Sequence, residues 1–241
     1  MDGDPKAVDA PTTLAKVVAA LFALKVALNA LIALPVGAYS LITYSTLPPG
    51  TDPHEELFLC DFLSLGVGVA QTLSSLLVAV LFLILIYRFN KALRVYFAKE
   101  MEFTPGWSVG WFFIPIANLF KPYQAVREMW LVARRGRSGT ALLKSWWALW
   151  LVSAALSQIS TKLAIKARTI PQYIASDTVS LLLDCLDIAY YVVVAFLVAK
   201  LASSVASAIA EAQEKAAAET PSAESSLDTT TGSSPPSVPE G

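Results

Sequence analysis

Long apolar stretches alternate with short polar ones along this chain of 241 residues. A helix needs about 18 or more consecutive apolar residues to cross a bilayer. Four stretches approach or exceed this length: residues 17–44, 62–87, 145–161 and 178–200, of which the third is short but rich in Trp. Barrel strands are excluded, because they run for about 9–11 residues and alternate in polarity. The pattern predicts an all-α integral membrane protein with four transmembrane helices in a bundle.

Both ends of the chain are polar and lie outside the predicted membrane domain, which covers residues 14–205. Residues 1–13 predict a flexible tail. They are acidic rather than basic, and the apolar stretch that follows exceeds the roughly 7–15 residues of a signal-peptide core, so we expect the first helix to be retained. Residues 206–218 are rich in Ala and Glu and predict a helical extension of the fourth span. Residues 219–241 are mostly Ser, Thr, Pro and Gly, which predicts a disordered tail.

Charged residues are few and unevenly placed. Only 15% of the residues are charged and 55% are hydrophobic, whereas soluble domains are roughly 25% charged. The first loop, residues 45–57, has no Lys or Arg, and residues 88–144 hold ten. Because cytoplasmic loops carry the excess of Lys and Arg, both termini are predicted to be cytoplasmic. Lys162, Lys166 and Arg168 in the third loop oppose this orientation but are outnumbered.

Residues 104–138, between the second and third spans, contain an aromatic stretch that is too broken to cross the membrane. Pro115 removes a backbone hydrogen bond in its middle, and a fifth span would move the following basic residues to the outer side. The segment predicts an interfacial or re-entrant aromatic helix, followed by an amphipathic helix over 122–135. Its candidate contacts with lipid or a partner are Trp107, Trp111, Phe112, Phe113, Asn118, Lys121, Tyr123, Arg127, Trp130, Arg134 and Arg135.

The same residues carry a family resemblance. The stretch FTPGWSVGWFFIPIANLFKPYQAVREMW (103–130), followed by WWALW (146–150), resembles the bacterial membrane family described as domain of unknown function 4328. The likeness covers residues 60–200. It implies a multi-span helical protein of the bacterial inner membrane, without an assigned activity.

Polar side chains inside the predicted spans form a second candidate site: Lys25, Asn29, Gln71, Asp184, Asp187 and Tyr191. Such residues face the interior of a helical bundle, because lipid does not solvate them. At about 1.5 Å per residue, Lys25 lies about 12 Å from one surface, and Asp187 about 13 Å from the other, of a core about 30 Å thick. The two are therefore within reach of each other. One interpretation is an ion, proton or ligand site. The other is structural: an ion pair, a lysine that snorkels to the surface, or an acid favoured by the helix dipole.

The remaining features point to no chemistry. The chain has no metalloprotease, hydrolase or phosphate-loop motif and no Cys/His cluster, so we expect neither an enzyme nor a cofactor or metal. His54 is the only histidine and lies in an acidic loop, DPHEE, which is interpreted as a solvated turn rather than a cation site. Cys60 and Cys185 lie near one predicted surface, where a disulfide is the alternative to two unpaired thiols. The basic residues suit a membrane surface better than a nucleic acid.

Three functional hypotheses follow. The favoured one is a non-catalytic inner-membrane protein that binds lipid, or docks a protein partner or a second copy of itself, through the aromatic segment 104–138. The alternative is a small transporter or channel that uses Lys25, Asp184 and Asp187. The third is an intramembrane enzyme that depends on a single carboxylate.

Overall fold

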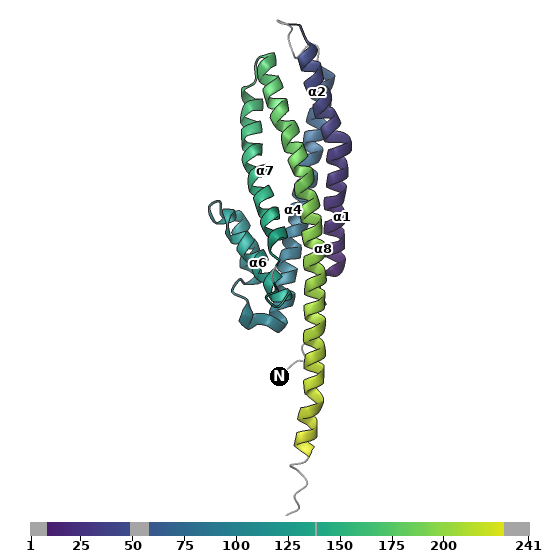
Figure 1. Cartoon of the computed structure of the whole chain (residues 1–241), viewed down its shortest axis with the longest axis vertical. Helices are drawn as coiled ribbons and strands as arrows, with labels where there is room; N and C mark the ends of the chain where they lie inside the picture. The colour runs from purple at the N-terminus through teal and green to yellow at the C-terminus, as the bar shows by residue number, and fades with distance from the viewer. Residues whose placement is uncertain (1–8, 49–57, 138, 229–241) are drawn as a thin grey trace, which may run out of the picture.

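The computed structural model describes residues 9–48, 58–137 and 139–228. Within these ranges every regular element is a helix (Figure 1). Four stretches are long and apolar enough to cross a membrane: Thr12–Thr46, Leu65–Glu100, Ala141–Lys166 and Ile170–Ala218. The predicted all-α class with four candidate spans is thereby confirmed.

The four long stretches are built from the following helices. The first comprises α1 (Thr12–Leu28), a π-helical turn η1 (Asn29–Ala33) and α2 (Leu34–Thr46), and the second comprises α4 (Phe58–Phe97) and a 3-10 turn, η2 (Ala98–Glu100). The last two are α7 (Ala141–Lys166) and α8 (Ile170–Asp228), joined by a short turn. All run beyond the apolar cores predicted from the sequence, because extending an existing helix gains one hydrogen bond for each residue added.

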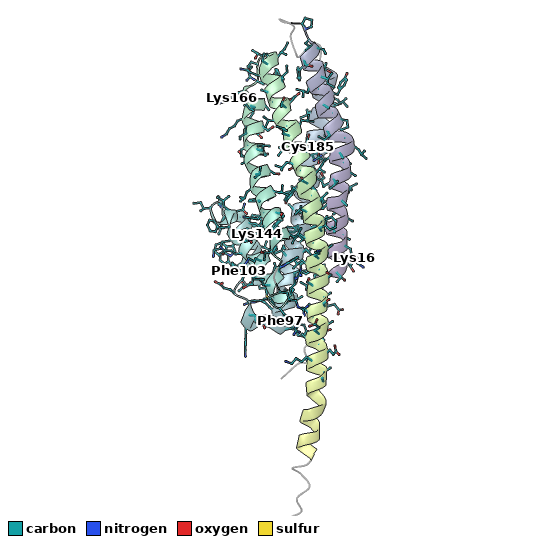
Figure 2. All side chains as sticks on the ribbon, viewed as in Figure 1. Lys16, Phe97, Phe103, Lys144, Lys166 and Cys185 are labelled. Atoms are coloured by element: carbon teal, nitrogen blue, oxygen red, sulfur yellow. The ribbon has the colours of Figure 1, made fainter. Side chains whose placement is uncertain are left out.

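The central helix of the bundle is α8. It packs along α7 on one side and along α1 and α2 on the other, whereas α4 and α7 have little direct contact (Figure 1). We call the end of the bundle that carries residues 98–140 the loop end, and the end at the α7–α8 turn the hairpin end. Figure 2 shows Phe97, Phe103 and Lys144 toward the loop end and Lys166 near the hairpin end.

At the loop end, α8 projects beyond the other helices (Figure 1). It continues without a break through residues 206–218 and on to Asp228. The helix also includes residues 219–228, for which the sequence predicted disorder. The physical reason for the extension is that a nucleated helix propagates at little cost. Residues 229–241, and residues 1–8 of the predicted amino-terminal tail, lie outside the described ranges.

A π-helical turn interrupts the first span just before Pro35. Proline has no N–H, and its ring crowds the carbonyl four residues earlier, so the usual hydrogen bond cannot form there. A π-turn accommodates one extra residue and lets the helix continue. Asn29 begins this turn and Ala33 ends it, and both are buried. The two ends of the turn therefore face the interior of the bundle, whereas residues 30–32 between them are exposed.

The segment between α4 and α7 folds against the loop end and does not cross the bundle. It comprises α5 (Pro105–Gly110), two 3-10 turns, η3 (Trp111–Phe113) and η4 (Ala117–Leu119), and α6 (Lys121–Ala133). The break between η3 and η4 contains Pro115, as expected for a residue that cannot donate a helical hydrogen bond. Contacts with α4 position α5, and α6 packs against α4 and α8. The structure thus has the predicted short aromatic helix followed by an amphipathic one.

The interior of the bundle changes from polar to apolar along α8. One face of α8 repeats at spacings of three and four residues, and we call this face the α8 seam. Toward the hairpin end the seam consists of Asp177, Ser180, Asp184, Asp187 and Tyr191, and toward the loop end of Val194, Val198, Leu201, Val205 and Ala208. The apolar part is buried against α4 and α6 in the larger of the two clusters of buried apolar residues. The polar part lies among the four apolar spans.

Candidate functional site

The ammonium group of Lys25 lies at the centre of the polar interior. Lys25 is on α1 and is 2% exposed. Its Nζ donates hydrogen bonds to the backbone oxygen of Gln71 (3.2 Å), to Gln71 Oε1 and to Ser74 Oγ (3.1 Å), all on α4. An ammonium group has three donors, and these bonds use all of them. Lys25 is therefore held in the interior by neutral acceptors and does not snorkel to a surface.

Asp187 of α8 attracts Lys25 without forming an ion pair with it. The charge of Asp187 acts on Lys25, but among the described residues the structure has no direct ion pair between Lys25 and Asp184 or Asp187. The structure therefore lacks the Lys25–Asp187 ion pair, which was one of the structural alternatives that the sequence left open. The physical reason is that neutral oxygens of α4 lie closer to the lysine and occupy its donors.

Tyr191 and Asn29 complete the environment of Lys25. The Lys25 Nζ lies 5.3 Å from the centre of the Tyr191 ring, close enough for a cation–π interaction. The Tyr191 ring also lies 6.2 Å from that of Phe22. Asn29, one turn beyond Lys25, is buried, and its Oδ1 has no hydrogen-bond partner within the described part of the chain. An unpaired buried oxygen is costly, so the amide of Asn29 is an unfavourable feature of the interior.

A cavity of about 280 Å³ lies beside Lys25, between α1, α4, α7 and α8. We call it the aromatic cavity, because rings from all four helices line it, including Phe22, Phe82, Trp146 and Tyr191. Phe112 of η3 also lines it. The aromatic segment therefore reaches the interior of the bundle as well as its surface.

A second cavity, of about 320 Å³, lies nearer the hairpin end between α2, α4 and α8. We call it the polar cavity, because Ser40, Gln71, Asp177, Ser180 and Asp184 line it. Ser40 Oγ donates a hydrogen bond to Asp177 Oδ2 (2.6 Å). Gln71 borders this cavity and also binds Lys25, which lines the aromatic cavity. A hydrogen bond thus joins a residue that lines one cavity, Lys25, to a residue that lines the other, Gln71.

At the loop end, the aromatic segment exposes a group of large apolar side chains. We call them the loop-end patch: Trp107, Phe113, Ile114, Ile116, Leu119 and Phe120. Phe113 is 72% exposed and Ile116 is 75% exposed. Single exposed apolar residues are common on proteins, but a contiguous group marks an interaction surface. Two predicted contact residues, Trp107 and Phe113, are therefore placed where a partner or lipid can reach them.

Other predicted contacts lie beneath this patch. Trp111, Phe112 and Asn118 are half-buried, and the Trp111 Nε1 and Asn118 Oδ1 atoms have no hydrogen-bond partner among the described residues. The Lys121 Nζ lies 5.6 Å from the Phe103 ring centre and 5.7 Å from that of Trp111. These residues support the patch from below rather than form its surface.

The structure corrects the prediction for the apolar face of α6. Val126, Met129 and Trp130 are buried against α4 and α8, where the sequence suggested contact with lipid. Trp130 is 1% exposed, so lipid cannot reach it. Tyr123 is half-buried, with its ring 6.2 Å from that of Trp147. The physical reason is that an amphipathic pattern shows which face is apolar but not whether protein or lipid covers that face.

The cationic side chains of α6 and of the two residues that follow it remain near the surface. Arg127 and Arg135 are exposed, and Arg134 is half-buried with its guanidinium 4.9 Å from the Trp130 ring centre. Arg135 Nη2 pairs with Glu211 Oε2 of α8 at 2.8 Å. Both partners of this ion pair are more than half exposed, so the pair contributes little to stability. Arg127 and Arg135 can therefore meet anionic head groups.

Three polar residues that the sequence did not single out fix the turn between α4 and α5. Asn90 and Arg94 donate hydrogen bonds of 3.0 and 2.9 Å to backbone carbonyls in residues 101–103. The Glu128 carboxylate accepts hydrogen bonds from backbone N–H groups of the same turn. Burial raises the pKa of the Glu128 carboxyl, and these N–H groups oppose the shift. No motif joins residues so far apart in the sequence, and only the fold could identify this clamp.

The cysteines and the histidine add no site. Cys185 is a free, exposed thiol, which agrees with its interpretation as unpaired. The Cys60 side chain and the whole of His54 lie outside the described part of the chain. Within the described ranges, no group of three or more His, Cys, Asp or Glu residues is placed to hold a metal ion.

Fold and interior together define the class of protein: a helical chain whose four longest helices are apolar enough to cross a membrane and enclose polar side chains. The chain belongs to the family described as domain of unknown function (DUF4328), which matches residues 51–203. This match confirms the resemblance found in the sequence. It includes Gln71, Asp184, Asp187 and Tyr191, whereas Lys25 and Asn29 precede it. Comparisons with curated proteins and with solved structures found no match.

Proposed function

We propose that this protein is a non-catalytic component of the bacterial inner membrane that binds lipid through its loop-end patch. In this proposal the loop end faces the cytoplasm, because residues 88–144 hold ten basic residues and cytoplasmic loops carry such an excess. The observation that carries the proposal is the patch itself, in which six large apolar side chains are exposed within residues 107–120.

Two further features favour lipid as the occupant of the patch. Trp107 is 52% exposed, and Trp rings prefer the head-group level of a bilayer. The cationic Arg127 of α6 and Arg135, just beyond the end of α6, follow the patch in the chain and are exposed, as suits anionic head groups. The clamp formed by Asn90, Arg94 and Glu128 holds the first turn of the segment in place, so the patch is presented on a fixed base.

Quenching of Trp fluorescence by brominated phospholipids tests this proposal. In vesicles that contain anionic lipid, we expect lipids brominated near the head group to quench Trp107 more than lipids brominated near the chain terminus. The contribution of Trp107 is the difference between the native protein and Trp107→Phe. The double variant Phe113→Glu, Ile116→Glu is expected to remove most of this quenching, because a carboxylate is disfavoured in an apolar layer.

The control is Gln124→Glu, which adds a carboxylate at an exposed position of α6 outside the patch. Brominated lipid should quench Trp107 in this variant as it does in the native protein. Quenching of Trp107 by aqueous iodide instead of brominated lipid would contradict the proposal. A protein that co-purifies with the native chain, and is lost from the Phe113→Glu, Ile116→Glu variant while brominated lipid leaves Trp107 unquenched, would identify a protein partner as the occupant.

A second candidate function is transport of a cation or proton, and the polar cavity favours it. Asp184 borders this cavity, Asp187 follows on the α8 seam, and Lys25 is buried nearby. Ionisable groups within a span are costly and mark ion pathways in many membrane proteins. The apolar part of the α8 seam would close such a path toward the loop end.

Flux through vesicles that contain the purified protein tests this second function. We expect Asp184→Asn and Asp187→Asn to abolish a pH-dependent cation flux while the protein stays folded by circular dichroism. Glu211→Gln removes a charge at the loop-end surface and is expected to leave the flux unchanged. Equal flux in all variants would contradict transport through these carboxylates.

A further inference from the structure

The polar cavity contains a carboxylate whose charge is not balanced by any residue in the described part of the chain. Asp184 borders this cavity and is half-buried. It forms no hydrogen bond or ion pair with another described residue, and the charged group that acts on it is a second carboxylate, Asp187. The positive charge of Lys25 acts on Asp187 instead. Asp184 therefore lacks a counter-charge.

The helix that faces Asp184 leaves space beside its carboxylate. Gly37 of α2 lines the same cavity, and a Cβ atom at this position would lie 3.9 Å from Asp184 Oδ2. Glycine has no side chain that could pair with a carboxylate. Elsewhere in the cavity, Asp177 accepts a hydrogen bond of 2.6 Å from Ser40 of α2. The bundle thus provides a partner for one carboxylate and an open position beside the other.

The two hydroxyl groups of the cavity offer lone pairs rather than hydrogens to a ligand. Ser40 donates its hydrogen to Asp177. Ser180 Oγ lies 2.8 Å from Ser160 Oγ and 3.1 Å from the backbone oxygen of Ser176. Because a hydroxyl group has one hydrogen, the Ser180 hydrogen is used within the protein in either arrangement. The remaining lone pairs of both hydroxyl groups can accept hydrogen bonds.

Acceptors therefore predominate in the polar cavity. Of the side chains that line it, only Gln71 carries an N–H group, since its Oε1 accepts from Lys25. A ligand with a positive charge and several N–H donors complements such a lining, because charge-assisted hydrogen bonds to a carboxylate are the strong ones. A primary ammonium group has three donors and one positive charge, as lysine shows.

The size of the cavity favours an organic cation over a metal ion. Its volume is about 320 Å³, whereas one water occupies about 30 Å³ in the liquid, so a bare ion would leave most of the space empty. In the described ranges, no three His, Cys, Asp or Glu side chains are grouped to hold a metal ion. The cavity also has apolar walls, formed by Ala33, Val36 and Val67. A short hydrocarbon chain can pack against them.

A phospholipid complements the cavity less well than a free amine. Gly68 lines the cavity and is exposed, and α4 is apolar enough to cross a membrane, so lipid can reach this side. An acyl chain brings no counter-charge for Asp184, and unpaired charge is costly within a membrane. Phosphatidylethanolamine carries an ammonium group, but its phosphate would come close to Asp177 and Asp184, and like charges repel.

We propose that the polar cavity binds a small primary ammonium compound, whose ammonium group pairs with Asp184 and whose hydrocarbon part contacts Val36 and Val67. The Ser40 and Ser180 oxygens are the acceptors for its other N–H groups. This inference names the substrate class of the second candidate function and rests on that function, but binding is measurable without transport.

Thermal unfolding of the full-length protein in detergent, followed by circular dichroism, tests the proposal. Butylammonium chloride replaces sodium chloride at constant ionic strength. We expect the Tm to rise and to saturate, because a ligand that binds only the folded state stabilises it. Tetramethylammonium has the same charge but no N–H group, and 1-pentanol has a similar chain but no charge. Neither is expected to raise the Tm in a saturable way.

Three variants locate the binding site. Asp184→Asn should raise the Kd of butylammonium at least about 30-fold, as expected for loss of one partner of a buried charge pair. Without ligand its Tm should not fall, because a neutral amide replaces an unpaired carboxylate. Gly68→Leu fills the cavity and should abolish the effect of butylammonium. Gly66→Leu is the matched control: neither glycine has another group within 4 Å of an added Cβ, but Gly66 does not line this cavity.

Several results would overturn this inference. One is a Tm that is the same in all the salts, and another is an equal rise in the native and Asp184→Asn proteins. Stabilisation by solubilised phosphatidylethanolamine but not by butylammonium would identify a lipid as the ligand instead. A pH-dependent cation flux without binding of butylammonium would contradict this inference alone. Binding of butylammonium without any flux would contradict transport alone, so failure of the two proposals is distinguishable.

Discussion

Replacing Trp130 by Ala is expected to lower the free energy of unfolding by about 3–5 kcal/mol, the range for removing a large aromatic side chain from a core. Trp130 is 1% exposed and lies where α4, α6 and α8 meet. The truncation leaves a cavity. The three surrounding helices cannot move to fill it, because protein interiors are close-packed. Denaturant unfolding in detergent, followed by circular dichroism, measures the change.

Trp107→Ala is the matched control for this prediction. The same side chain is removed, but from a position that is 52% exposed, where substitutions usually change stability by about 0.5 kcal/mol or less. If the two variants lost equal stability, Trp130 would not be a core residue. Such a result would instead support the interpretation from the sequence, in which the apolar face of α6 contacts lipid.

Gln71→Leu is expected to lower the free energy of unfolding by about 2–3 kcal/mol, because hydrogen bonds to charged groups contribute about 1.5–3 kcal/mol. The substitution removes the Oε1 acceptor of the buried Lys25 ammonium and leaves the backbone oxygen and Ser74 as its partners. Leu has a similar volume, so packing changes little. Unfolding in detergent with increasing denaturant measures the loss.

A double-mutant cycle with Lys25→Met shows whether this loss comes from the lysine. In the Lys25→Met background, Gln71→Leu should lower the free energy of unfolding by less than about 1 kcal/mol, because no buried charge is left without a partner. Lys25→Met alone should keep or raise stability, since a buried charge is often replaceable by an apolar side chain of similar size. Equal costs of Gln71→Leu in both backgrounds would show that Gln71 acts independently of Lys25.

The positions of Lys25 and α6 show how far sequence patterns reach. The sequence correctly predicted that Lys25, Gln71 and Tyr191 face the interior, because lipid does not accept polar side chains. It left open an ion pair between Lys25 and Asp187, which the structure does not contain. The height of a residue along a helix follows from its number in the sequence, but the rotation of one helix relative to another does not. In the structure, this rotation places Gln71 of α4 in hydrogen-bond contact with Lys25.

The sequence by itself determined the number of long apolar helices and the place where the aromatic segment breaks. Both depend on local properties, namely the length of an apolar run and the missing N–H of Pro115. Only the tertiary structure decided which surface covers the apolar face of α6, which side chains clamp residues 101–103, and which side chains line the two cavities. These features arise from contacts between helices that are far apart in the chain, so no local pattern records them.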